Sequence, residues 1–138
     1  MDTWTWYPII FFFRLFMRHR VKGHRLGRTD APRKALIRNL VTSLILHEKI
    51  VTTEAKAKAI APLFDRLVTT VKNKDSMNAI RDVKRMVFGE VAQRKMMDDI
   101  KPRFENRSSG YTRIRKIGFR DGDGAPEVRL EIFTEINA

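Results

Sequence analysis

Five Lys or Arg residues lie within residues 17–28, and no acidic residue separates them. The same stretch contains two histidines and two glycines and has no hydrophobic periodicity, so we expect an extended arm rather than a helix or strand. Cationic side chains at this density can neutralise successive phosphates and donate hydrogen bonds to their oxygens. We therefore predict that residues 17–30 form a basic arm that binds RNA or DNA. Its candidate contact residues are Arg18, His19, Arg20, Lys22, His24, Arg25 and Arg28.

A second basic stretch, residues 101–120, holds seven Lys or Arg residues against one acid. Strand alternation would place Arg113 and Arg115 on one face together with Tyr111. Such a face can hold a nucleic-acid backbone and offer a ring on which a base stacks. A core position explains Tyr111 equally well, and the sequence leaves that alternative open. The candidate residues of this second surface are Arg107, Tyr111, Arg113, Arg115, Lys116 and Arg120.

Further candidate cations fall on two predicted helices. Lys34 and Arg38 are one helical turn apart, and with Arg33 they could hold the first helix on a phosphate backbone. Lys56 and Lys58 could do the same at the start of the second helix.

Other chemistry finds little support in the residues. The chain has no cysteine, no Gly-rich phosphate loop and no nucleophile beside a base. His47-Glu48 could form an acid–base pair, but a histidine at a helix end more often complements the helix dipole. Asp121 and Asp123 lie in a Gly-containing turn, where two acids usually mark only the turn. We expect no enzymatic activity, no metal, no cofactor and no small-molecule substrate.

The charge of the whole 138-residue chain points to the same partners. Its net charge is +12, and a charge of this size attracts nucleic acid or an anionic membrane surface. The excess is concentrated in residues 17–60 (+8) and 101–120 (+6), whereas residues 121–138 carry −4. Two separate basic stretches indicate a directed surface rather than a uniformly basic coat.

Residues 1–16 form an apolar extension of a different character. Arg14 interrupts the apolar run, which is too short to span a bilayer. The extension lacks the features of a signal peptide and the Arg- and Ser-rich composition of a transit peptide. We expect the functional start at Met17, with a weak interfacial membrane anchor as the alternative.

Hydrophobic periodicity and turn residues divide the rest of the chain into short elements. Helices are expected over residues 29–49 and 53–72, from residue 75 or 76 to Phe88, and over 90–100, and strands over 49–53, 110–117 and 128–132. Pro62 should kink the second helix or delay its start, and Pro102 should stop the fourth. We predict that residues 31–138 form a single α+β domain, in which about four helices cover one face of a small three-stranded sheet.

Several short blocks of sequence follow one another along residues 17–138. They are MRHR at residues 17–20, Arg38-Asn39, His47-Glu48, Thr52-Thr53 followed by Lys56-Ala57-Lys58, Gly110-Tyr111-Thr112-Arg113, Gly122-Asp123 and Ala125-Pro126. In sequence and in order these blocks resemble the bacterial large-subunit ribosomal protein L17 family. Ser109 stands where that family usually has a glycine before Tyr-Thr-Arg.

The resemblance implies more than composition alone can. It implies an α+β fold with a small mixed sheet, no enzymatic activity, and a structural place in the large ribosomal subunit near the peptide exit tunnel. The partners would be large-subunit rRNA and neighbouring ribosomal proteins. A bacterial cytoplasm is favoured over an organellar ribosome, because no import sequence is evident.

Two alternatives from other classes remain at this point. A free-standing basic nucleic-acid-binding protein would need a recognition helix, for which the face of Lys34 and Arg38 is the only candidate. A membrane-surface protein would depend on residues 1–16 together with the basic arm.

Overall fold

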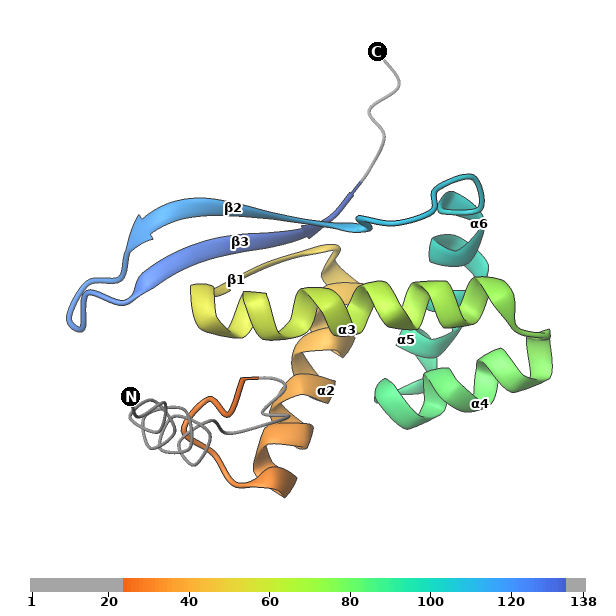
Figure 1. Cartoon of the computed structure of the whole chain (residues 1–138), viewed down its shortest axis with the longest axis horizontal. Coiled ribbons are helices and arrows are strands. Elements are labelled where there is room, and N and C mark those ends of the chain that lie inside the picture. The colour runs from red at the N-terminus through yellow and green to blue at the C-terminus, as the bar shows by residue number, and fades with distance from the viewer. Residues whose placement is uncertain (1–23, 134–138) are drawn as a thin grey trace, which may run out of the picture.

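A computed structural model of the chain describes residues 24–133, and Figure 1 shows its elements. They are α2 (Asp30–His47), β1 (Lys49–Thr53), α3 (Glu54–Asn73), α4 (Ser76–Met86), α5 (Glu90–Lys95), a π-helical segment η1 (Met96–Ile100), α6 (Lys101–Arg103), β2 (Thr112–Phe119) and β3 (Pro126–Ile132). The expected α+β fold is confirmed. The apolar extension, residues 1–16, lies outside the described residues.

The three strands form one sheet in the order β1-β3-β2, and both pairings are antiparallel. The expectation of a mixed sheet is therefore wrong. β2 and β3 are joined by a short turn, which forces them to run in opposite directions. β1 pairs with the other edge of β3, with Ile50 opposite Leu130 and Thr52 opposite Val128.

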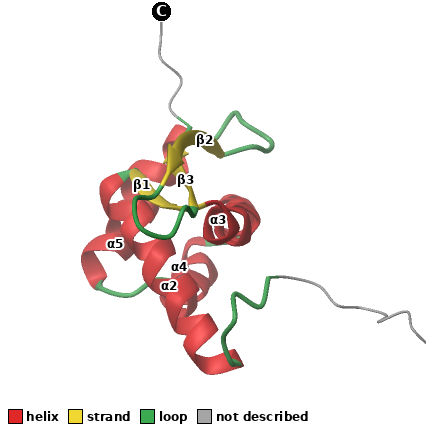
Figure 2. Cartoon of the chain, turned by 90° about the vertical axis from the view of Figure 1, so that its left-hand side faces the viewer, coloured by secondary structure: helices red, strands yellow, loops and turns green. Residues whose placement is uncertain are grey.

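The helices lie on one side of the sheet, with α3 packed directly against it (Figure 2). Side chains alternate along β3, so Val128, Leu130 and Ile132 are buried against the helices. The other face of the sheet stays open to solvent. This arrangement lets one strand contribute both core residues and surface cations.

α3 is the central helix of the core. Ile60, Phe64 and Val68 recur at helical spacing and are fully buried between the sheet and the other helices. The helix begins at Glu54, so the expected late start at Pro62 is wrong and the helix includes Pro62. Pro62 has no N–H to offer the carbonyl one turn before it, and its exposed position leaves that carbonyl accessible to water.

The last helical run differs from its expected course at Pro102. α5 passes into η1 and then into α6, so helical structure continues to Arg103 instead of stopping before the proline. Because α6 continues directly from η1, Pro102 lies inside the helical run, and its missing N–H leaves one carbonyl of the preceding turn without that donor. Ile100 and Phe104, on either side of it, are both buried.

Candidate nucleic-acid interface

The open face of the sheet gathers cations from all three strands. Strand pairing places Arg113 of β2 and Lys49 of β1 on either side of Glu131, and Arg115 opposite Arg129. We call this the open sheet face, defined by Lys49, Arg113, Arg115 and Arg129. All four cations are exposed, whereas the two acids on this face, Glu127 and Glu131, are partly buried. A phosphate approaching this face would therefore meet cations first.

Two arginines stand directly across from each other on this face. Arg115 donates to Glu131 at 2.9 Å, and no acid pairs with Arg129 among the described residues. Like charges directly opposite each other destabilise a sheet. An anionic partner would remove that cost, because it would neutralise both guanidinium groups at once.

A shallow hollow of about 240 Å³ lies beside the arginine pair. Its lining consists of three cations, two acids and two apolar residues: Lys49, Arg113, Arg115, Glu48, Glu131, Ile132 and Phe133. The Phe133 ring lies under two guanidinium groups, 3.7 Å from that of Arg107 and 4.9 Å from that of Arg113. These cation–π contacts hold both arginines over the same edge of the sheet.

Tyr111 does not belong to this surface, so the expected stacking face is wrong in this respect. Its side chain is only 1% exposed. The ring packs edge-on against Phe104 at 5.0 Å, and the hydroxyl lies within hydrogen-bond distance of the carbonyls of Arg107 and Ser108. The core alternative therefore holds for Tyr111, and it offers no ring to a base.

Lys116 was expected on the same surface as Arg113 and Arg115, but the structure places it on the opposite face of the sheet. It pairs with Val128, whose side chain points into the core, so Lys116 leaves β2 on the opposite face from Arg113 and Arg115. Its charge instead acts on Glu54 at the start of α3. A hydrogen bond from Lys58, 2.7 Å away, is the larger reason why the pKa of Glu54 is lowered.

The candidate cations of α2 are partly engaged within the protein. Arg33 and Lys34 both pair with Asp30, and the hydrogen bond from Lys34 is the main cause of that carboxyl's lowered pKa. Arg38 lies over the Phe88 ring at 3.8 Å, and its Nε is buried without a hydrogen-bond partner. Arg38 therefore joins α2 to the turn between α4 and α5, and it does not share an open face with Lys34.

The remaining candidates are spread over the molecule. His24, Arg25 and Arg28 are exposed before α2, and Lys56 lies partly buried near the start of α3. Arg120 is paired with Asp123, which also accepts from the N–H of Ala125. The arm residues Arg18, His19, Arg20 and Lys22 lie outside the described residues.

The chain matches a family of known proteins over most of its described residues. The family model described as Ribosomal protein L17 matches residues 36–133, well over half of the chain. The chain belongs to the ribosomal protein L17 family. The resemblance to the L17 family, which rested on short blocks, is thereby confirmed over residues 36–133.

Individual members of the L17 family are similar over most of their length. A protein of Thermomicrobium roseum named "Large ribosomal subunit protein bL17" is 48% identical over 115 residues, which cover 83% of this chain and 97% of that protein. A protein of the same name from Hyphomonas neptunium is 47% identical, covering 84% and 82%. A third, from Syntrophotalea carbinolica, is 44% identical, covering 86% and 76%.

Membership of a family of ribosomal proteins confirms the expectation that the chain is not an enzyme. Among the described residues, no group of three His, Asp or Glu side chains could hold a metal ion. No helix in the described part of the chain is long and apolar enough to cross a membrane.

Glu48 of the pair His47-Glu48 has a structural role, because its carboxylate pairs with cations of two other helices. Glu48 ends α2 in a left-handed conformation (φ 61°). Its carboxylate accepts from Arg103 at 2.9 and 3.3 Å and pairs with Lys95 at 3.0 Å. The hydrogen bond from Arg103, followed by that from Lys95, lowers the pKa of Glu48 to about 2. Glu48 therefore ties the end of α2 to α5 and α6.

Replacing Glu48 with Gln should destabilise the protein by about 1–2 kcal/mol near pH 7, after allowance for solvent screening. The pKa of Glu48 is lower in the folded state, so its contribution is complete above pH 4.5 and is lost as the pH falls towards 2. Urea unfolding measures the difference in free energy of unfolding between the unmodified protein and Glu48→Gln. This difference should narrow as the pH falls from 4.5 towards 2. The control is Glu90→Gln, which breaks a highly exposed pair with Arg94 and should cost under about 0.5 kcal/mol. A gap for Glu48→Gln that is independent of pH would contradict this account.

Sequence reasoning missed two cations of the open sheet face, Lys49 and Arg129. Lys49 precedes Ile50 and Arg129 lies between Val128 and Leu130, so alternation along the two predicted strands places both cations on the face away from the core. Their grouping with Arg113 and Arg115 depends on the strand order, which the sequence does not show.

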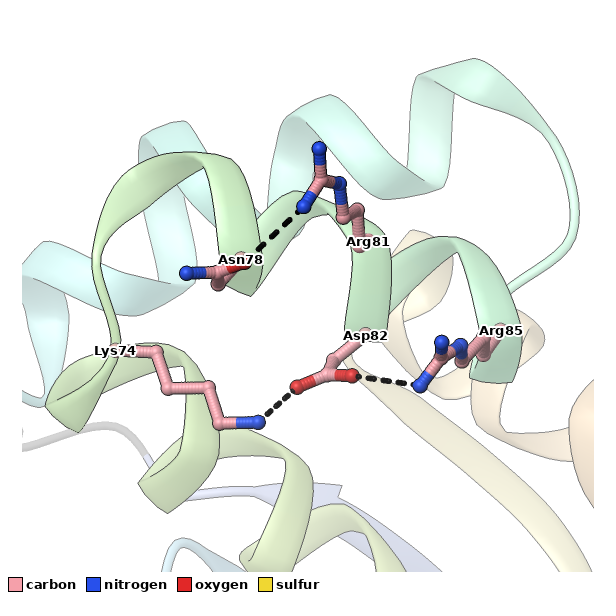
Figure 3. Close-up of polar contacts among 5 residues, drawn as sticks. All are labelled: Lys74, Asn78, Arg81, Asp82 and Arg85. Carbon is pink, nitrogen blue, oxygen red and sulfur yellow. Dashed lines mark hydrogen bonds and ion pairs between the residues drawn. The ribbon is translucent and has the colours of Figure 1, made fainter.

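A cluster on α4 was missed as well (Figure 3). Lys74 and Arg85 both reach Asp82, and Arg81 donates to the side-chain oxygen of Asn78 at 3.3 Å. One carboxylate is thus shared by two cations, and the residues of this cluster line a hollow of about 380 Å³. Asp82 already neutralises part of the charge of Lys74 and Arg85, whereas no described acid pairs with Arg129, so this cluster is the weaker candidate for binding phosphate.

Proposed function

We propose that this chain is a structural component of the large ribosomal subunit in the bacterial cytoplasm, where it binds rRNA near the peptide exit tunnel. Its relatives are named as large-subunit proteins, and the family match covers the described domain. The contacts with rRNA would be made by the open sheet face and by the basic arm. Neighbouring ribosomal proteins would be the other partners.

The opposed pair of Arg115 and Arg129 on the open sheet face is the observation that carries the proposal. In the isolated protein the two guanidinium groups face each other, and Glu131, the only described acid that pairs with either of them, pairs with Arg115. A phosphate backbone running across the sheet would meet four cations from three strands. Phosphate contacts of this kind position a protein on RNA without reading its sequence.

The basic arm would add a second contact at a different side of the molecule. The described chain enters α2 at the end farthest from the sheet (Figure 1). Arg25 and Arg28 are exposed and precede α2, close in sequence to Arg33 and Lys34 at its start. Lys56 and Lys58, at the start of α3, would provide further phosphate contacts beside the sheet. The protein would thus hold RNA at more than one side.

The test of the open sheet face is the double variant Arg113→Gln/Arg129→Gln. Two lost phosphate contacts should lower the affinity for large-subunit rRNA by about 10- to 30-fold at physiological salt. The slope of log affinity against log salt should become shallower by about 1.4 to 1.8. Filter binding over a range of KCl concentrations measures both quantities, and the melting temperature checks the fold.

The matched control removes the same charge from α4, as Arg81→Gln/Arg85→Gln, and should lower the affinity by less than about threefold. Equal losses in the two variants would show that total charge, and not the open sheet face, determines binding. Sedimentation provides the independent check on the ribosomal role. Absence of the unmodified protein from salt-washed large subunits would contradict that role directly.

A further inference from the structure

The hairpin formed by β2 and β3 ends in exposed apolar side chains. Phe119, the last residue of β2, is 78% exposed, and Ile117 is 51% exposed. The turn end of the β2–β3 hairpin extends beyond the helices (Figure 1). We call residues 117–127 the hairpin tip. An aromatic ring displayed at the end of a projecting hairpin is typical of a side chain that a partner buries.

The hairpin tip is held in a defined shape. The N–H of Arg120 donates to the carbonyl of Ala125 at 2.9 Å, and the N–H of Gly124 donates back to Arg120 at 3.0 Å. The ion pair of Arg120 with Asp123 closes the same turn. A register shift between Lys116 and Gly118 redirects the strand at Ile117. A turn fixed in this way loses little conformational entropy when it binds.

The charge of the hairpin tip differs from that of the rest of the protein. It carries Asp121, Asp123 and Glu127 against Arg120 alone, and the ion pair with Asp123 neutralises that arginine. The hydrogen bonds from Arg120 and from the Ala125 N–H hold the pKa of Asp123 at about 2, so this carboxyl stays charged at neutral pH. The tip therefore has a net negative charge within a chain of net charge +12. Phosphates would be repelled here, whereas cationic side chains would be attracted.

We propose that the hairpin tip binds a neighbouring basic protein of the large subunit, inserting Phe119 and Ile117 into an apolar pocket rimmed by Lys or Arg. The apolar pair supplies the buried centre of the contact, and the exposed carboxylate of Asp121 pairs with the cationic rim. This inference rests on the proposed function, because it places the partner in the large subunit. It divides the molecule between an RNA-binding open sheet face and a protein-binding hairpin tip.

Photo-crosslinking in intact particles tests the proposal. Phe119 is replaced by the photoreactive benzoylphenylalanine, whose excited ketone inserts into nearby C–H bonds of protein and, less efficiently, of ribose. Salt-washed large subunits carrying this residue are then irradiated. The expected product is one adduct with a basic protein, identified by mass spectrometry. The control places the same group at Val91, which is 72% exposed on α5, and should not give this adduct. An adduct with rRNA, with an acidic protein or with a second copy of this chain would overturn the proposal, as would no adduct.

A second variant separates this proposal from the proposed function. Phe119→Ala should leave the affinity for protein-free large-subunit rRNA unchanged within about twofold, since the tip makes no phosphate contact. In particles, a benzoylphenylalanine at Ile117 should give the same adduct, and Phe119→Ala should reduce its yield at least about tenfold. An undiminished yield would overturn the hairpin contact alone. Absence of the chain from large subunits would overturn the proposed function and this inference together.

Discussion

Replacing the five cations of the basic arm with Gln is expected to lower the affinity for large-subunit rRNA about 1,000-fold at physiological salt. The replaced residues are Arg18, Arg20, Lys22, Arg25 and Arg28. Each phosphate contact releases counterions, so the slope of log affinity against log salt should become shallower by about 3.5 to 4.5. Filter binding of both proteins between about 0.1 and 0.5 M KCl would measure the slopes.

The control for the arm variant removes five cations from α4, α5 and the turn before α4. They are Lys74, Arg81, Lys84, Arg85 and Arg94. The net charge then falls equally in both variants, so any difference between them reflects position. A loss of under about tenfold in the arm variant, or an unchanged slope, would show that the arm does not bind phosphates.

Replacing Tyr111 with Ala is expected to destabilise the protein by about 3–5 kcal/mol. The side chain is fully enclosed, so its removal leaves a cavity and abolishes the edge-on contact with Phe104. A small domain has about 5–15 kcal/mol in total, so the loss would be a large share of its stability. Chemical unfolding at a temperature where both proteins are folded measures the difference.

The companion variant Tyr111→Phe keeps the ring and removes only the hydroxyl that faces the carbonyls of Arg107 and Ser108. It should cost about 1 kcal/mol and leave rRNA affinity within about twofold of the unmodified protein. Tight rRNA binding that disappears in a stable, folded Tyr111→Ala protein would instead support base stacking on this ring. That result would also require Tyr111 to leave the core on binding.

Local elements of this fold could be predicted because their periodicity is strong. The alternation of Val128, Leu130 and Ile132 with charged residues marks a half-buried strand, and the β-branched run after Glu48 marks another. The strand order could not be predicted, because it depends on β1 pairing with a segment more than seventy residues away. The π-helical segment and the continuation past Pro102 also depend on packing, through the buried Met96, Ile100 and Phe104.

The candidate site was predictable in part, for the same reason. Arg113 and Arg115 were found because they lie two apart in one strand, whereas Arg129 is their neighbour only through strand pairing. Burial of Tyr111 could not be read from strand alternation, since Tyr111 precedes β2 and packs against Phe104 at the end of α6. Helical periodicity places Arg38 on an exposed face of its helix, whereas in the structure its guanidinium group packs over the ring of Phe88.

β2 is an edge strand, and the N–H and C=O groups on its outer side lack a neighbouring strand among the described residues. Unpaired strand edges with apolar side chains invite aggregation, and Ile114, Ile117 and Phe119 all lie on β2. Arg115 and Lys116 lie between Ile114 and Ile117, and Arg113 directly precedes Ile114. The repulsion between these cations on two copies discourages the copies from aligning edge to edge. These arginines would therefore also discourage aggregation of a newly made copy before it is assembled. This role does not depend on whether they contact rRNA.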